Sequence, residues 1–182
     1  MSGIVQIGGV ALASHNEGTD KVSLDSGIVF PAGHILQCKA ASKTDKSTTD
    51  STTPASTGLT VVIKPSKAEH KIYVQALVGC LGHSLDKKRT FISISGGTSQ
   101  SVGDATTGHE CGACWCPRSA DEAWGQGSLV CAFLDAPDST SDQTYTLNFW
   151  TTSGTCAINS AYNNDANVGN AMSTLTAWEV VA

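Results

Sequence analysis

The segment from residue 109 to residue 116 contains residue types that bind metal ions. His109, Cys111, Cys114 and Cys116 fall within it, and Cys111 and Cys114 have the Cys-x2-Cys spacing of half a zinc site. A structural zinc site normally takes its remaining ligands from a second pair, and the sequence has no other Cys-x2-Cys or His-x3-His pair. We therefore expect no metal and no cofactor, with zinc and a local disulfide left open as alternatives to free loop thiols.

Residues that could perform catalysis are not grouped in the sequence. No Gly-x-Ser-x-Gly motif is present, and no nucleophile is paired with a base. Asp121 and Glu122 are adjacent carboxylates, but neighbouring acids in a loop are usually solvated charges. We therefore expect a protein that is not an enzyme. The five histidines are scattered along the chain: His15, His34, His70, His83 and His109.

Two tryptophans lie in a long segment, residues 96–127, that has no clear periodicity. Trp115 and Trp124 could stack on a sugar or pack against a neighbouring subunit, since aromatic side chains are frequent binding anchors. The alternative is that both close a small local core under the loop. A loop of this length in a compact domain is usually functional or has structure of its own.

The elements that would position these residues are short strands. Apolar residues alternate with polar ones in residues 59–64, 71–81, 129–135 and 144–151, and turn residues separate these segments. The pattern predicts an all-β fold, an antiparallel β-sandwich of the jelly-roll type. The alternation assigns these residues to the core: Leu36, Ile72, Val74, Val78, Ile92, Phe133, Leu147 and Phe149.

The first thirty residues differ from the rest of the chain. Their apolar residues form short patches broken by glycines, which is too little to build a core. We expect residues 1–30 to be an extended arm or a few short strands that dock on a partner or make trimer contacts, and residues 31–182 to be the sandwich domain. The residues expected to contact the partner are Ile4, Val5, Ile7, Val10 and Leu12.

Composition excludes several classes of partner. The formal net charge is -5 and only 15% of the residues are charged, so we expect no general binding to nucleic acid or to an anionic membrane. No apolar run has the length of a membrane span, and the first residues lack the features of a signal peptide. An odd number of cysteines, seven, argues against a complete disulfide framework.

Four segments resemble, in order and spacing, a domain common in tailed phages, notably marine and cyanobacterial ones. They are FPAGHILQ at residues 30–37, TGLTVVIKPS at 57–66, AFLDAP with TYTL between 132 and 147, and STLTAWEV at 173–180. The resemblance covers about residues 28–182. It implies a structural component of a phage particle, a trimer that ends a fibre or spike or decorates the virion.

The short N-terminal segment distinguishes a decoration protein from the end of a long fibre. Fibre members of this group usually carry a long shaft before the domain, and residues 1–30 are too few to form one. We therefore expect a trimeric capsid decoration or cement protein that binds the major capsid protein or other virion proteins. The alternative is a short tail-fibre or spike head that binds a host receptor or surface glycan. Either protein would be made in the host cytoplasm and located in the virion.

Overall fold

The computed structural model describes residues 4–7, 10–16, 18, 21–24, 28–85, 88–98, 111–116, 127–160 and 170–182. The chain divides into two compact units, Met1–His34 and Ile35–Ala182. The described residues contain strands and no helix, and so no helix that could cross a membrane. The expectation of an all-β protein is confirmed.

The first unit contains a three-stranded antiparallel sheet in the order β1-β2-β3. The strands are β1 (Ile4–Ile7), β2 (Val10–Asn16) and β3 (Lys21–Leu24). Ile4 is exposed. The other residues expected to contact a partner lie on β1 and β2, and their side chains are outside the described part of the chain: Val5, Ile7, Val10 and Leu12.

A tight turn ends the first unit. The His34 N–H donates to the Pro31 carbonyl at 3.1 Å, and the His34 ring stacks on Phe30 with 4.5 Å between centroids. Gly33 has a φ of 85°, which a glycine adopts without strain. The turn therefore explains the FPAGH sequence. Gly33 adopts its left-handed backbone, and His34 closes it with a backbone hydrogen bond and a ring stack on Phe30.

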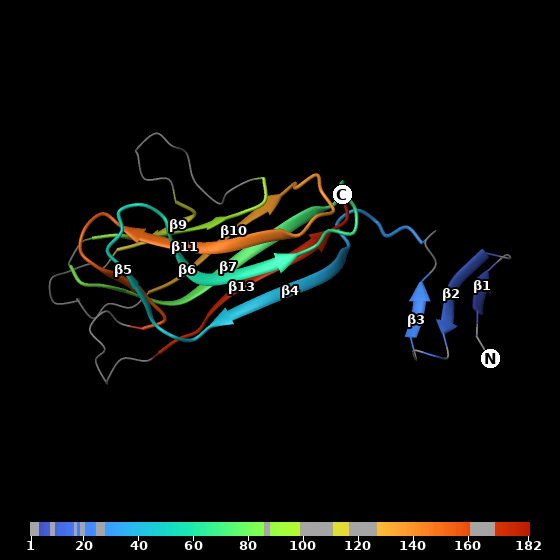
Figure 1. The fold of residues 1–182 in the computed structure, drawn as a ribbon, viewed down its shortest axis with the longest axis horizontal. Coiled ribbons are helices and arrows are strands. Elements are labelled where there is room, and N and C mark those ends of the chain that lie inside the picture. Colours follow the sequence, from blue (N-terminus) through green and yellow to red (C-terminus); the bar gives the residue numbers. More distant parts are fainter. Residues whose placement is uncertain are drawn as a thin grey trace. The chain divides into compact units, whose positions relative to one another are not determined.

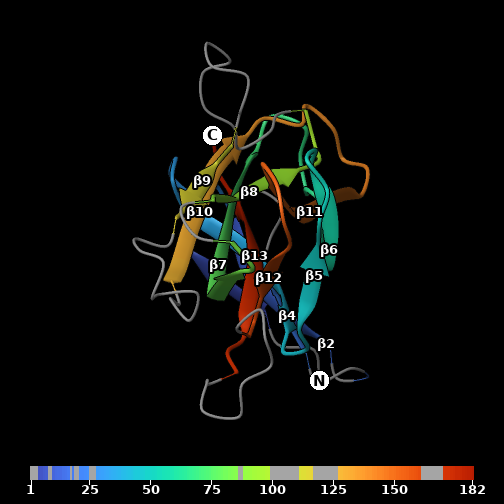
Figure 2. The same ribbon diagram turned by 90° about the vertical axis from the view of Figure 1, so that its left-hand side faces the viewer.

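The second unit is a sandwich of two sheets in which every strand pairing is antiparallel (Figure 1). One sheet has the order β4-β13-β7-β12-β5, and β10 also pairs with β7; the other has the order β6-β11-β8-β9. Figure 2 shows β6 on one side and β7 and β10 on the other. The bounds are β4 (Ile35–Lys43), β5 (Ser47–Thr49), β6 (Ala55–Ile63), β7 (Lys71–His83), β8 (Thr90–Ser95), β9 (Ala113–Trp115), β10 (Gly127–Asp135), β11 (Gln143–Thr151), β12 (Cys156–Ile158) and β13 (Ser173–Val180).

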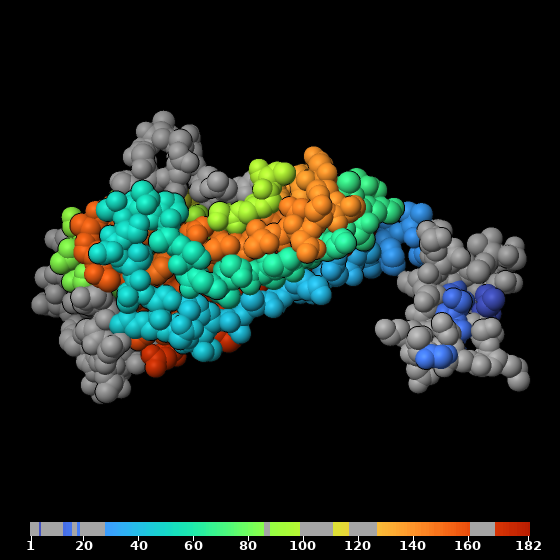
Figure 3. Space-filling model, viewed as in Figure 1, coloured from blue at the N-terminus to red at the C-terminus, as the bar shows by residue number. Residues whose placement is uncertain are grey.

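The core lies between the sheets and follows the predicted alternation. Along β6, for example, Val61 and Ile63 are buried and Val62 between them is 47% exposed. Phe133 is half-buried and packs edge-on against the Tyr145 ring. Figure 3 shows the outer surface on the side of β6, where β6 and β11 lie side by side. Six of the expected core residues are fully buried: Ile72, Val74, Val78, Ile92, Leu147 and Phe149.

The predicted phase of β4 is wrong. Leu36 is only half-buried, Cys38 and Ala40 are exposed, and Ala41 packs against the core instead. Cys38 and Ala40 pair with Trp178 and Thr176, which lie on the outer side of β13, so the opposite side of β4 faces the core. A register shift takes Leu36 out of this alternation: Gln37 pairs with Glu179 while Ile35 pairs with Val180, so Leu36 is the extra residue of a bulge. A bulge interrupts the period of two, which the sequence pattern assumed to be continuous.

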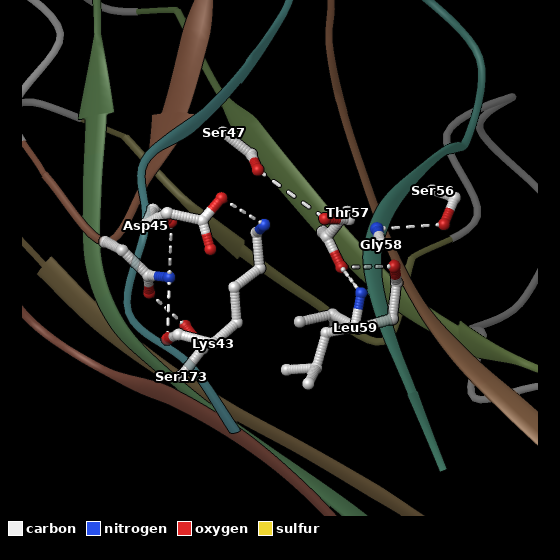
Figure 4. Close-up of polar contacts among 10 residues, drawn as sticks. Lys43, Asp45, Ser47, Ser56, Thr57, Gly58, Leu59 and Ser173 are labelled. Carbon is white, nitrogen blue, oxygen red and sulfur yellow. Dashed lines mark hydrogen bonds and ion pairs between the residues drawn. The ribbon is translucent and has the colours of Figure 1, made fainter. Parts of the chain in front are cut away.

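A second bulge explains the TGL segment in β6. The β6–β11 register shifts between Thr146 and Asn148, and Gly58 has a φ of 79°. The Thr57 hydroxyl donates to the Leu147 carbonyl at 2.9 Å and accepts the Leu59 N–H at 3.1 Å (Figure 4). The threonine side chain therefore replaces the ladder bonds that the bulge removes, and glycine provides the left-handed backbone.

Candidate interaction surface

The cysteine-rich segment is described only in part. Cys114 and Cys116 are exposed, Cys111 is half-buried, and His109 lies outside the described residues. Burial raises the pKa of Cys111, and the neighbouring Cys114 thiol raises it further. No disulfide joins the seven cysteines, all of which lie in the described ranges, and within those ranges no three His, Cys, Asp or Glu side chains gather as a metal site would require.

The structure describes one of the two tryptophans expected as possible ligand contacts. Trp115 lies on β9 and is half-buried against the hydrophobic core. A side chain at Gly127, the first residue of β10, would collide with the Trp115 indole, so the two strands approach closely there. Trp124 lies outside the described residues.

A buried carboxylate at the end of β13 gathers polar groups that the sequence pattern did not single out. Glu179 Oε1 accepts bonds from the Ser66 N–H at 2.7 Å, the Ser66 hydroxyl at 2.6 Å and His70 Nδ1 at 2.7 Å. Gln37 Nε2 donates to Glu179 Oε2 at 2.6 Å and to the Lys64 carbonyl at 2.7 Å. This cluster ties the connection between β6 and β7 to β13 and to the edge strand β4.

Hydrogen bonds to Glu179 outweigh its burial. Burial raises the pKa of this carboxyl, but bonds from Ser66, His70 and Gln37 lower it to a net value of about 2. The sequence held one signal for this cluster: Leu175 and Ala177 are buried in alternation, and the next core position in β13 is an acid. A charge at a core position requires partners.

The arrangement of Ser66, His70 and Glu179 does not activate a nucleophile. In a hydrolase triad the serine bonds to one imidazole nitrogen and the carboxylate to the other. Here the Ser66 hydroxyl and His70 Nδ1 both bond to the same carboxylate oxygen, and the hydroxyl lies 3.3 Å from that same Nδ1, the nitrogen that the carboxylate already takes. The hydroxyl is therefore a donor that holds the carboxylate in place, and the group is a structural clamp.

A second polar cluster joins the β4–β5 turn to β12 and β13. Asn159, with a φ of 66°, donates through its amide to the carbonyls of Lys43 at 2.9 Å and Asp45 at 3.0 Å. Its side-chain oxygen accepts the Ser173 hydroxyl, and its carbonyl accepts the Ala171 N–H at 2.9 Å. Figure 4 shows Lys43, Asp45 and Ser173 converging at this point. The cluster is fully bonded and structural.

His83, at the end of β7, is buried in its neutral form. Its Nδ1 accepts the Leu85 N–H at 2.9 Å, so Nε2 carries the proton and donates to the Thr151 hydroxyl at 2.7 Å. Burial lowers the pKa of His83, and the positive charge of Lys88 acts in the same direction. A second proton on Nδ1 would face the Leu85 N–H.

We expect His83 to make the fold less stable in mild acid. Its pKa is lower in the folded chain than in the unfolded chain, where it is about 6.5. The unfolded chain therefore takes up the proton first, and stability falls as the pH drops below about 6.5. Urea unfolding at pH 7.5 and 5.5 measures this loss, and the loss should be smaller in His83→Gln. Exposed His34→Gln is the control, and equal losses in wild type and His83→Gln would contradict the prediction.

Four strands of the larger sheet expose uncharged side chains on its outer face. The register aligns these side chains in three rows that run across β10, β7, β13 and β4. We call this surface the uncharged face. Its rows are Val130, Leu77, Thr174 and Ser42; then Ala132, Gln75, Thr176 and Ala40; then Leu134, Tyr73, Trp178 and Cys38.

Large apolar side chains are exposed on this face. Leu134 is 57% exposed, Val130 52% and Leu77 45%. Tyr73 is exposed beside Trp178, with 5.5 Å between the ring centroids. Tyrosine and tryptophan are enriched in protein interfaces, where they supply large contact areas at low entropic cost. The uncharged face is therefore the candidate site for binding another protein surface.

Comparisons with known proteins do not identify a family. No family model matches the chain, and no curated protein matches its sequence. A chain in the structure of the infectious bursal disease virus Gt strain is 14% identical with a TM-score of 0.40, over 89% of this chain and 42% of that one. A chain of infectious bursal virus derived T=1 particles is 11% identical with a TM-score of 0.38, over 89% and 40%.

A non-viral structure is also similar at a lower score. The exo-beta-1,3-galactanase from Phanerochaete chrysosporium is 13% identical with a TM-score of 0.21, over 91% of this chain and 32% of that chain. The present chain spans about two fifths of the length of the viral chains and a third of the galactanase. These scores assign no family, and the chain is described by its own structure: an antiparallel β-sandwich with a separate three-stranded N-terminal unit and a broad uncharged face.

Proposed function

We propose that this chain is a structural protein of a virus particle, a trimeric decoration or cement protein of a tailed-phage capsid. The observation that carries the proposal is that one small chain has two separate features suited to contacts with other subunits. The first is the N-terminal unit, Met1–His34, which forms a three-stranded sheet of its own. The second is the uncharged face on the sandwich. A protein that bridges other subunits needs contact surfaces of this kind.

The resemblance of four sequence segments to a tailed-phage virion domain supports the same proposal. Two of these segments have clear structural roles, since FPAGH forms the turn before β4 and TGL forms the bulge in β6. Such motifs define a domain rather than a catalytic site. The proposed location is the virion, after synthesis in the host cytoplasm, and the proposed partners are the major capsid protein and other virion proteins.

A decoration protein of this type acts by binding and without catalysis. It stabilises a shell because it binds the assembled state and not the dissociated subunits, so binding shifts the assembly equilibrium by mass action. In a trimer, three N-terminal units dock at once, and the second and third docking events benefit from a high effective concentration. The proposed docking residues are Ile4, Val5, Ile7, Val10 and Leu12.

Deleting residues 2–28 is expected to abolish attachment to particles that lack this protein. The deletion removes β1, β2 and β3 but leaves the sandwich unit intact, so the product should stay folded. Co-sedimentation of full-length and truncated protein with such particles measures attachment, and circular dichroism checks the fold.

Three outcomes would contradict the proposal in different ways. Co-sedimentation of the truncated protein at the full-length stoichiometry would place attachment on the sandwich. Unfolding of the truncated protein would show that the N-terminal unit belongs to the core. Binding of the isolated full-length protein to host cells, with competition against phage adsorption, would favour the fibre-head function and a host receptor or glycan as ligand.

A further inference from the structure

The acidic residues in the described part of the sandwich lie away from the uncharged face. The four strands that form it contain two acids, Asp135 and Glu179, and both are buried on the opposite side of the sheet. The exposed acids in the described part of the sandwich lie in connections between strands: Asp45, Asp50, Glu69, Asp138 and Asp142. In a chain of net charge -5, this face is a surface on which two copies can meet without like-charge repulsion, and unlike the outer side of β6 it also exposes several large apolar and aromatic side chains.

The face is large enough to form a subunit contact. Four strands about 4.8 Å apart, with three rows about 6.7 Å apart along them, present roughly 400 Å² in projection. Lys71, Val180 and Ile35 form a fourth row at one end, which adds further apolar area and a single charge. A standard interface takes about 800 Å² of accessible surface from each partner. The face alone thus supplies a large part of one partner's share.

We propose that copies of this chain pack against one another through the uncharged face. Three copies that turn this face toward a common axis enclose an apolar interior, with Tyr73 and Trp178 near its centre and the acidic connections outside. The occupant is a second copy because its surface is equally uncharged, whereas a charged partner would find no complementary group on these three rows. The inference rests on the proposed trimer and is independent of how the trimer attaches.

A charge placed on the face should separate the copies without unfolding them. Leu134 is more than half exposed in the single chain, so Leu134→Lys adds a charge that water can solvate in the monomer but not in the contact. We expect Leu134→Lys to weaken self-association about thirtyfold or more, the effect of replacing one interface anchor by a charge. Val62→Lys, at a 47% exposed position of β6 on the other sheet, is the matched control and should leave association unchanged.

Cys38 provides an independent readout within the face. It is exposed in the single chain and pairs with Trp178 across the strands, so self-association should shield it from a maleimide. Cys114, which is exposed on β9 of the other sheet, is the internal control in the same sample. Peptide mass spectrometry should show slow labelling of Cys38 in wild type and rapid labelling in Leu134→Lys, with Cys114 labelled equally in both.

Mass measurement by light scattering decides the proposal together with this labelling. A wild-type trimer that becomes monomeric in Leu134→Lys, with Cys38 exposed, supports it. A Leu134→Lys variant that keeps the wild-type mass and labelling overturns it. A monomeric wild type also overturns it, and if Leu134→Lys then loses particle binding, the face contacts a shell protein. Attachment itself is scored separately by co-sedimentation of the N-terminal deletion.

Discussion

Replacing Glu179 by leucine is expected to destabilise the protein by about 3–5 kcal/mol, the range for removing one partner from a buried charged group. The variant leaves the Ser66 N–H, the Ser66 hydroxyl and the Gln37 amide without their acceptor inside the protein. The buried His70 ring also loses its carboxylate partner, and a buried donor without a partner costs its full desolvation energy. Urea unfolding followed by circular dichroism measures the loss. Glu69→Gln, at an exposed acid, is the control and should be close to neutral.

Glu179→Gln separates the charge of this residue from its shape. The amide keeps one oxygen for the Ser66 and His70 donors, so we expect a smaller loss than in Glu179→Leu. The wild-type pKa of about 2 lies below the unfolded value of 4.5, so the ionised carboxylate stabilises the fold above pH 4.5. That stabilisation is lost as the pH falls from about 4.5 to about 2, and Glu179→Gln should lack this part of the pH dependence. Identical acid profiles in wild type and Glu179→Gln would contradict this assignment.

Replacing Ile72 by alanine is expected to cost about 2–5 kcal/mol, the range for truncating a fully buried aliphatic side chain. Ile72 lies near the start of β7, opposite Asp135 of β10 and Glu179 of β13, and has no exposed surface. At this point β7 itself is bonded on both sides, to β10 and to β13, so the cavity cannot collapse easily. The midpoint of urea denaturation is the measurement.

A substitution of the same kind on the outer surface is the control for Ile72→Ala. Val62→Ala removes aliphatic atoms from a side chain that is 47% exposed, and its cost should stay within about 0.5 kcal/mol of zero. Phe133→Ala should fall between the two, since Phe133 is half-buried against Tyr145. A near-neutral Ile72→Ala would mean that the central strand is not packed as described.

Local pattern was sufficient for the fold class and for most of the core. A period of two is a property of one strand, so Val74 and Val78 of β7 and Leu147 and Phe149 of β11 could be assigned to the interior without knowing their neighbours. Leu36 could not, because both the side of β4 that faces the core and the bulge at Leu36 depend on how β4 pairs with β13. The register between two strands distant in sequence is not encoded in either strand alone.

The polar clusters and the uncharged face required the tertiary structure. In the sequence alone, Glu179 is a charge at a core position without visible partners. The fold brings Ser66 and His70 to it from more than a hundred residues away. The uncharged face is formed by β10, β7, β13 and β4, whose order in the sheet differs from their order in the sequence. Each strand alone shows alternating residues with an unremarkable outer side. Only the pairing of the strands places these outer sides in common rows, and so the chain's candidate contact surface was decided by topology, while its sandwich class was decided by local sequence.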